Sequence, residues 1–428
     1  MSKALRIAVA GLGTVGGGVA SVLLTRGKEL EERAGRNLEL VGVSARDKSK
    51  SRAANISKIA WENDARALVK SDADVIVELI GGEEGIAYDL VKSALIAKKH
   101  VVTANKALLA YHGAELAALA EENNVALKFE AAAAGGIPIV KALRESLIAY
   151  GIDSVRGILN GTCNYILTQM EATGQSFDDV LKEAQRLGYA EADPTLDVGG
   201  GDTAHKLAVL SALAFGATPN LKSMKIEGIE HITPDDIKFA REFGYRIKLL
   251  GLARKRGEHI DQRVQPAMVK LATPLADVEG PFNAVVANAG EAGPFFFEGR
   301  GAGEAPTAGA VVADLVDIAR GSFGAPFGRP AKSLTPNDEP PGPRSCAFYL
   351  RFEVLDVPGV LAEIASRLSE SEVSIESMIQ RGRAPGEPVA IVMITHECVE
   401  TSVANALKAI AASAKVVAKP CMIPMESR

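Results

Sequence analysis

A glycine-rich stretch in the middle of the chain concentrates side chains that could carry out acid–base chemistry. Residues 188–206, GYAEADPTLDVGGGDTAHK, hold four carboxylates and end on a lysine: Glu191, Asp193, Asp197, Asp202 and Lys206. Asp202 and Lys206 are four residues apart, so on a helix they face the same side. The residues that follow, LAVLSALAFG, are apolar enough to bury that helix. Desolvation makes a lysine a better proton donor and a nearby carboxylate holds it in place, so the pair could be a general acid with its support. The alternative is an exposed ion pair that contributes little.

A second chemical feature lies near the N-terminus, where residues 11–16 read GLGTVG between an apolar run and a helical pattern. Glycines in such a turn allow a tight bend, close approach of a pyrophosphate and helix packing, while the helix N-terminus offers free N–H groups. The position at the first strand–helix turn predicts a dinucleotide site. The residues expected to contact the cofactor are Gly11, Gly13, Thr14, Val15 and Gly16.

The end of the second predicted strand bears on the choice of cofactor. An NAD site usually has an acid there for the ribose hydroxyls, but this strand ends in Ser44-Ala-Arg46, with Lys48 and Lys50 nearby. Arg46 could bind a 2'-phosphate, which favours NADP. NAD stays open, because Asp47 could instead contact the ribose.

The elements that must position these residues alternate between strands and helices, which predicts an α/β fold with a parallel sheet. A Rossmann-type domain is expected over residues 1–136, with residues 302–325 packing back on it through an amphipathic helix. An α+β catalytic and dimerisation domain is expected over 137–301. The expected strands of the first domain are Leu5–Ala10, Leu38–Ser44, Val75–Ile80, His100–Thr103 and Ala126–Glu130, and its later helices are Ala87–Lys98 and Gly113–Asn123. In the second domain we expect helices over Val140–Tyr150 and Cys163–Ala172.

A proline- and glycine-rich segment, residues 326–345, predicts a linker. Beyond it, residues 346–428 read strand, helix, strand, strand, helix, strand, which is the βαββαβ order of ferredoxin-like folds. The C-terminal domain is therefore expected to fold as a separate module.

Composition excludes several classes of protein. With 47% hydrophobic and 24% charged residues the chain has the balance of a globular protein, and a net charge of −5 without a basic window gives no footprint for nucleic acid. Four dispersed cysteines and six dispersed histidines give no disulfide framework or transition-metal spacing. No apolar run is long enough for a membrane span and no secretion signal is evident, so we expect a cytoplasmic protein.

The segment Ala184–Lys206 closely resembles the signature of the homoserine dehydrogenase family, A-x-x-x-G followed by D-P-x-x-D and G-x-D-x-x-x-K, with every fixed position present. The resemblance implies reversible hydride transfer between L-homoserine and L-aspartate 4-semialdehyde, in threonine, methionine and isoleucine biosynthesis. It implies that Lys206 donates the proton to the aldehyde oxygen, that Asp202 supports it, and that Glu191 and Asp197 lie at the substrate's amino end.

The resemblance extends over residues 5 to 325 and implies further site residues. Asn160, Gly161 and Thr162 are assigned to the substrate, Lys106 to catalysis and the cofactor, and Thr103 and Gly303 to the cofactor. A monovalent cation, expected to be sodium, would be held at Glu130 and at the backbone carbonyls of Ala133, Gly135 and Ile137. One departure, Gly309 where many relatives have serine or alanine, affects only local packing.

Leu355-Asp-Val-Pro-Gly-Val360 resembles the opening of an ACT domain, a module that commonly binds amino acids at paired interfaces. The resemblance implies threonine as an effector and a homodimer or homotetramer, unless the module only supports oligomerisation. An aspartate semialdehyde dehydrogenase is disfavoured, because Cys163 has no histidine partner in local sequence. A catalytically silent sensor of NADP and an amino acid remains the rival, but it would have no need of Asp202 and Lys206.

Overall fold

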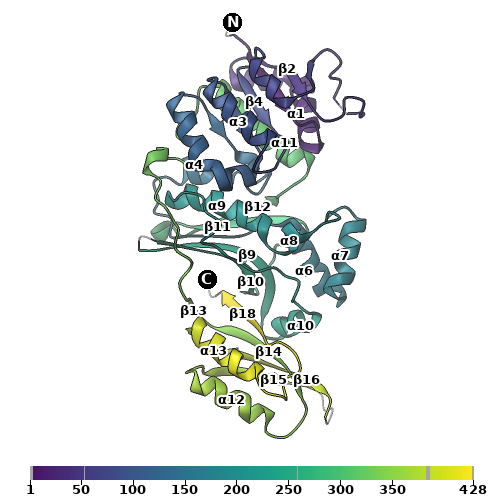
Figure 1. Cartoon of the computed structure of the whole chain (residues 1–428), viewed down its shortest axis with the longest axis vertical. Helices are drawn as coiled ribbons and strands as arrows, with labels where there is room; N and C mark the ends of the chain where they lie inside the picture. Colours follow the sequence, from purple (N-terminus) through teal and green to yellow (C-terminus); the bar gives the residue numbers. More distant parts are fainter. Residues whose placement is uncertain (1–2, 53, 258, 382–385, 427–428) are drawn as a thin grey trace.

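The computed structural model describes residues 3–52, 54–257, 259–381 and 386–426. Three parts follow one another along the long axis of the molecule: an N-terminal domain, a central domain and a C-terminal domain (Figure 1). The fold is α/β, as the alternation of strands and helices predicts.

The N-terminal domain is a parallel sheet in the order β3-β2-β1-β4-β5-β6. Its core forms because the strands are almost wholly apolar on both faces, as in β1, whose Ala8 and Val9 lie on opposite faces and are both fully buried. The strands are β1 (Leu5–Ala10), β2 (Leu38–Ser44), β3 (Ala60–Glu62), β4 (Val75–Glu78), β5 (His100–Thr103) and β6 (Leu127–Lys128). The helices are α1 (Thr14–Thr25), α2 (Gly27–Ala34), α3 (Ile86–Ile96) and α4 (Lys106–Glu122).

Helix α4 begins seven residues earlier than the sequence pattern predicts. Its apolar periodicity is clear only from Gly113, but the side chain of Asn105 accepts a hydrogen bond from the backbone N–H of Leu108 at 3.0 Å and so caps the helix at its start. The earlier start places Lys106 in the first turn of α4, at the carboxyl edge of the sheet.

The late helix α11 (Glu304–Ala319) lies against α1 and shares the apolar core of the N-terminal sheet. Gly18 of α1 allows this close approach, since a Cβ there would lie 2.8 Å from the side chain of Glu304. In Figure 1 this green helix sits among the purple and blue elements of the N-terminal domain.

The central domain packs helices on one face of a sheet. Its strands are β7 (Ser154–Ile158), β8 (Lys225–Ile226), β9 (Tyr245–Arg256), β10 (His259–Lys270), β11 (Phe282–Asn288) and β12 (Pro294–Arg300). Its helices are α5 (Ile139–Lys141), α6 (Gly161–Thr173), α7 (Phe177–Arg186), α8 (Thr195–Val198), α9 (Gly201–Phe215) and α10 (Pro234–Glu242).

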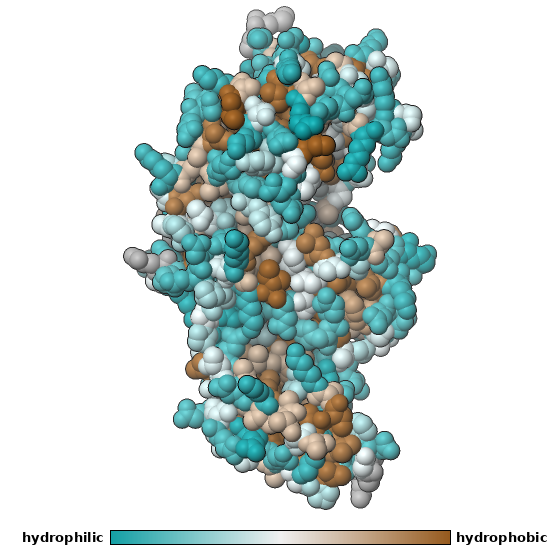
Figure 2. All heavy atoms as spheres, in the orientation of Figure 1, coloured by the Kyte–Doolittle hydropathy of each residue, from teal (hydrophilic) through white to brown (hydrophobic). Residues whose placement is uncertain are grey.

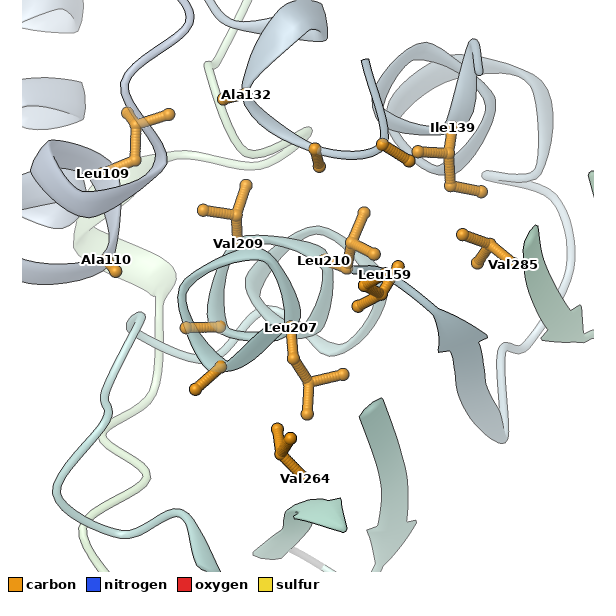
Figure 3. Close-up of a cluster of buried hydrophobic side chains, with 14 of the residues drawn as sticks. Leu109, Ala110, Ala132, Ile139, Leu159, Leu207, Val209, Leu210, Val264 and Val285 are labelled. Carbon is orange, nitrogen blue, oxygen red and sulfur yellow. The ribbon is translucent and has the colours of Figure 1, made fainter. Parts of the chain in front are cut away.

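Helix α9 is surrounded by apolar side chains from both domains. Figure 3 shows Leu207 directed toward Val264 of β10, while Val209 lies on the side of α9 that faces Leu109 of α4. A helix buried on so many sides gives its polar residues a fixed position.

The helix predicted over Val140–Tyr150 ends early, at Ser146, and is mostly not α-helical. Only α5 is α-helical, and the next turn, Ala142–Ser146, is π-helical, closed by the Leu147 N–H donating to the Ala142 carbonyl at 2.8 Å. The wider turn leaves Arg144 buried, with its guanidinium 6.0 Å from the centre of the Phe129 ring.

The C-terminal domain has the predicted βαββαβ order. It comprises β14 (Phe348–Leu355), α12 (Val360–Glu370), β15 (Ile375–Gln380), β16 (Pro388–Thr395), α13 (Glu400–Ala411) and β18 (Cys421–Glu426), with a short ladder of β13 (Ser345–Cys346) and β17 (Cys398–Val399). Its strands lie in the order β18-β14-β16-β15.

The last strand, β18, joins the central and C-terminal sheets. It pairs with β14 over residues 421–424, and then Met425 and Glu426 pair in parallel with Met268 and Val269 of β10. Figure 1 shows the yellow β18 beside the teal β10, so the C-terminal domain is hydrogen-bonded to the central sheet.

The segment before the C-terminal domain is anchored to both the N-terminal and the central domain. Phe327 is fully buried against Phe129, with ring centres 5.3 Å apart, and the side chain of Asn337 both accepts from and donates to the backbone of Ile260 at 3.2 Å. These contacts restrict the freedom of the C-terminal domain.

The surface in Figure 2 is mainly hydrophilic, with scattered apolar side chains, and is hollowed between the N-terminal domain and the lobe that carries α6 to α8. Across the described part of the chain, no helix combines the length and apolar character that a membrane span requires.

Candidate active site

Asn160 organises the turn between β7 and α6. Its side-chain oxygen accepts from the Cys163 N–H at 2.7 Å, which caps α6, and its amide nitrogen donates to Asp197 at 2.7 Å and to Asp202 at 2.8 Å. With 4% exposure, Asn160 is held tightly. It therefore fixes two carboxylates from α8 and α9 relative to each other.

Asp202 is the centre of a buried charged cluster. Lys206 Nζ lies 2.8 Å from Asp202 Oδ2 and donates to the Leu159 carbonyl at 2.7 Å, while Lys106 Nζ lies 3.2 Å from Asp202 Oδ1. Burial by itself would raise the pKa of Asp202, but the two ammonium groups and the Asn160 amide outweigh it and hold that pKa well below its usual value. Asp202 is thus ionised and keeps both lysines in place. Asp202 and Lys206, which the sequence predicts to face each other, form a buried ion pair. The exposed fraction of the side chain is 8% for Asp202 and 12% for Lys206.

Lys106 reaches this cluster because β5 and α4 meet at the edge of the N-terminal sheet. Thr103 at the end of β5 is fully buried, and its hydroxyl donates to Glu78 at 2.6 Å. Glu78 also accepts from the backbone N–H of Ile80 at 2.7 Å, so it holds the loops that follow β4 and β5 together. The side chain of Thr103 faces Glu78.

Asp197 is close to the cluster and Glu191 is not. Burial raises the pKa of Asp197, with a further contribution from the charge of Asp202, and the Asn160 amide only partly offsets this. Glu191 lies in an exposed loop, and its backbone carbonyl accepts from Gln185 at 3.0 Å. The Glu191 side chain makes no hydrogen bond or ion pair with a described residue.

The start of α6 holds Gly161 and Thr162 beside this loop. A Cβ at Gly161 would lie 2.8 Å from the Pro281 carbonyl, so only glycine fits, and the Thr162 hydroxyl donates to the Tyr189 carbonyl at 2.7 Å. Cys163, one residue on, is fully buried with its thiol donating to the Asp197 carbonyl at 3.2 Å. Burial and the charge of Asp197 raise the pKa of this thiol well above its usual value, which makes it unsuited as a nucleophile.

The turn of residues 11–16 has the shape a dinucleotide requires. Gly11 has φ +95°, and a Cβ there would lie 2.4 Å from the Leu79 carbonyl, while a Cβ at Gly16 would lie 1.8 Å from the Gly11 carbonyl. At Gly13, by contrast, a Cβ would meet nothing within 4 Å. Gly13 is also the N-cap of α1, followed by Thr14 and Val15, so open space lies before a helix N-terminus and the turn fits a pyrophosphate.

Beyond β2, Arg46 is exposed and forms no ion pair or side-chain hydrogen bond with a described residue. Asp47 is engaged within its own loop, since its carboxylate accepts from the backbone and the hydroxyl of Ser49 at 2.8 and 2.6 Å. These hydrogen bonds lower the pKa of Asp47. On the other side of the cofactor turn, Gly303 caps α11 with φ +109°.

Glu130 lies in a buried connection between the two domains. Its carboxylate accepts from the N–H groups of Val140 at 3.0 Å and Lys141 at 2.8 Å. Burial, together with the charge of Asp314, raises the pKa of Glu130 to about 7. Glu130, Gly135 and Ile137 line one cavity of about 480 Å³, and Ala133 is buried beside them. Among the described residues, no group of three or more His, Cys, Asp or Glu side chains could hold a metal ion.

Three further polar residues near the cluster, Asn283, Glu78 and His205, were not predicted from the sequence. Asn283 of β11 donates to the Leu159 carbonyl at 2.9 Å, the same carbonyl that binds Lys206. The sequence does carry a signal for Glu78, because it is an acid at the end of an otherwise apolar strand. His205, next to Lys206, is buried with its ring 5.8 Å from Tyr111, and burial together with the charge of Lys106 lowers its pKa. Nothing local marks Asn283, because its partner lies 124 residues away.

A dinucleotide turn on a parallel sheet, with a lysine–carboxylate cluster beside the carboxyl edge of that sheet, defines an NAD(P)-dependent oxidoreductase. Family models described as "Homoserine dehydrogenase, NAD binding domain", "Homoserine dehydrogenase" and "ACT domain" match residues 11–130, 138–316 and 348–414. The chain belongs to the homoserine dehydrogenase family, and its C-terminal domain is an ACT domain.

Two relatives match along almost the whole chain, and a third matches along about three quarters of it. The homoserine dehydrogenase of Neisseria gonorrhoeae is 45% identical, covering 99% of each chain. The crystal structure of a homoserine dehydrogenase from Thiobacillus denitrificans has a TM-score of 0.91 at 42% identity and covers 99% of this chain and 98% of its own. A hyperthermophilic archaeal homoserine dehydrogenase in complex with NADPH has a TM-score of 0.65 at 26% identity, covering 76% of this chain and 100% of its own.

Proposed function

We propose that this chain catalyses reversible NADP-dependent hydride transfer between L-homoserine and L-aspartate 4-semialdehyde, a step toward threonine, methionine and isoleucine. The observation that carries the proposal is the cluster of Lys206, Asp202 and Lys106, which joins α9 of the central domain to α4 of the dinucleotide-binding domain. A substrate beside this cluster would lie at the carboxyl edge of the sheet, where ligands of such folds bind.

Lys206 is the proposed proton donor. During reduction of an aldehyde the carbonyl oxygen gains negative charge, which a fixed ammonium group stabilises before it delivers a proton. Asp202 and the Leu159 carbonyl take two of the donor directions of Lys206 and thereby aim the third. Lys106 is the second cation of the site, and we assign it to the developing charge and to the cofactor.

The amino end of the substrate is assigned to Asp197 and Glu191. An ammonium group needs carboxylates, and Asp197 is held near the cluster by the Asn160 amide. Glu191 would have to approach from its exposed loop when substrate binds. Asn160, Gly161 and Thr162 complete the proposed substrate-binding residues, at the N-terminus of α6.

The cofactor supplies the hydride, and the chain supplies its binding site. We assign Gly11, Gly13, Thr14, Val15 and Gly16 to the pyrophosphate, and Thr103 and Gly303 to the surroundings of the cofactor. Arg46 is assigned to a 2'-phosphate. NADP is favoured over NAD because Arg46 is unpaired while Asp47 is occupied by Ser49, and because the archaeal relative is described with NADPH.

A monovalent cation, proposed to be sodium, would be held by Glu130 and the carbonyls of Ala133, Gly135 and Ile137. A single carboxylate with backbone carbonyls suits a hard ion of low charge. The cavity shared by Glu130, Gly135 and Ile137 supports this assignment. The bound charge would favour the ionised form of Glu130, whose burial opposes it.

The ACT domain is proposed to bind an amino acid, with threonine, a downstream product, as the feedback effector, and to pair in a homodimer or homotetramer. The hydrogen bonds between β18 and β10 give a path by which its state could reach the central domain. Regulation requires that the effector bind one activity state more tightly than the other.

The proposal is tested by mixing purified protein, NADPH and aspartate 4-semialdehyde and following the loss of nicotinamide absorbance. Wild-type protein is expected to oxidise NADPH, Lys206→Ala to be inactive, and added threonine to slow the wild type. Replacing NADPH by NADH measures the cofactor preference. A folded wild-type protein that binds NADPH but leaves it unoxidised would instead support the silent sensor.

A further inference from the structure

A narrow cavity at the junction of the central and C-terminal domains carries a concentrated positive charge. It has a volume of about 80 Å³, and five arginines but only two carboxylates line it. A single water needs roughly 10–15 Å³ of such space, so the cavity has room for a group larger than one water. The arginines are Arg156, Arg254, Arg256, Arg263 and Arg344, and the acids are Asp261 and Glu426.

The strand register explains why these side chains gather. Leu252 of β9 lies directly opposite both Arg156 of β7 and Arg263 of β10, so the three form a row on one face of the sheet. Two residues along β9 on the same face, Arg254 lies opposite Asp261. The C-terminal domain closes the row from the other side.

Three of the arginines already have partners. Arg263 pairs with Asp261 and with Glu400, both at 2.8 Å, and Arg344 pairs with Glu426 at 2.6 Å. Arg256 lies 3.5 Å from Asp261. Both carboxylates that line the cavity, Asp261 and Glu426, are therefore already paired.

The other two arginines, Arg156 and Arg254, have no such partner in the described part of the chain. Neither forms an ion pair or a side-chain hydrogen bond with any residue that the structure describes. Burial of Arg156, reinforced by the like charge of Arg254 and only partly countered by Glu426, lowers the pKa of its guanidinium. A half-buried guanidinium beside another cation is stabilised by an anion that pairs with both.

We propose that this cavity binds a small oxyanion, a carboxylate or phosphate group, between Arg156 and Arg254. Guanidinium groups bind the paired oxygens of either anion through parallel N–H donors. Since β13 and β18 also line the cavity, the ligand would bridge the central sheet and the C-terminal domain. Arg156 is three residues from Leu159, whose carbonyl binds Lys206, so the site lies on the strand that leads to the catalytic cluster.

The test is calorimetric titration of the full chain with inorganic phosphate and, separately, with succinate, both in the presence of oxidised NADP so that the dinucleotide site is filled. Saturable binding is expected for at least one probe, and the tighter probe identifies the group. Arg156→Gln and Arg254→Gln should each weaken binding at least about tenfold, because each removes a charge-assisted pair.

Lys255→Gln is the matched control. It removes one positive charge from the position next to Arg254 on β9, where the side chain is exposed like that of Arg254 but lies on the opposite face of the strand, and should leave the affinity unchanged. Arg156→Lys keeps the positive charge but lacks the paired N–H donors of a guanidinium, so it should bind the probe with intermediate affinity. An intermediate affinity would show that the variants lose the binding site and not the fold. The proposal is overturned if wild-type protein binds neither probe saturably, or if Lys255→Gln weakens binding as much as Arg254→Gln.

Discussion

Replacing Lys206 with methionine tests the catalytic cluster most directly, because it removes the ammonium group and keeps the apolar stem inside α9. At 2.8 Å and an effective dielectric of about 20, the attraction between Lys206 and Asp202 is about 6 kcal/mol before desolvation is counted. Breaking a buried pair by removing one partner costs about 3–5 kcal/mol. Because Lys106 and Asn160 still bind Asp202, we expect the lower end, about 3 kcal/mol of unfolding free energy.

Activity should fall further than stability alone would explain. A positioned general acid contributes about 10²–10⁴-fold, so we expect kcat of Lys206→Met to fall by about 10³-fold at a temperature where the variant is fully folded. The double variant Asp202→Asn/Lys206→Met removes both charges and should recover most of the lost unfolding free energy, but no activity. Urea unfolding and NADPH oxidation measure the two quantities on the same samples.

The control is Lys182→Met, an exposed lysine on α7, which should change neither quantity. If Lys206→Met kept kcat within about tenfold of wild type, Lys206 would not be the general acid. A double variant less stable than Lys206→Met would show that the unpaired charge of Asp202 is not what destabilises the single variant.

Three further predictions follow from single residues. Arg46→Ala should raise the KM for NADPH about tenfold or more and leave that for NADH unchanged, because only NADPH has the extra phosphate; equal changes in steady-state assays would contradict the assignment. Gly11→Ala should destabilise the fold by more than about 2 kcal/mol in thermal unfolding, since its Cβ would lie 2.4 Å from the Leu79 carbonyl, whereas Gly13→Ala should stay within about 1 kcal/mol of wild type. Burial, reinforced by a neighbouring arginine, lowers the pKa of Lys248 to about 8 from 10.5. Between these pH values Lys248 is protonated in the unfolded chain but largely neutral in the folded chain, so the unfolding free energy of the wild type should increase by roughly 3 kcal/mol as pH rises. Lys248→Met should lack this increase when urea unfolding is measured at each pH.

The sequence predicted the features that depend on local pattern. The strand β5 (His100–Thr103) has the predicted bounds, because its ends are set by neighbouring turns and by its own apolar run. Helical spacing alone placed Asp202 and Lys206 on one face, and the apolar residues beyond them favoured burial. The exposed pair that the sequence also allowed is ruled out by the structure. The π-helical turn after α5 was not predictable, because its residues have an ordinary helical pattern and the inward position of Arg144 depends on distant Phe129.

What the sequence determined by itself was therefore the fold class, most strands of the N-terminal sheet, the βαββαβ order of the C-terminal domain and the pair of residues at the centre of the candidate site. Only the tertiary structure decided that Lys106 completes this pair, since its contact with Asp202 joins two domains and spans nearly a hundred residues. Only the tertiary structure, likewise, brought five arginines into one cavity, because strand register and the pairing of β18 with β10 decide which side chains become neighbours. Periodicity fixes which way a side chain points within its own element, but the contacts across elements depend on how those elements pack.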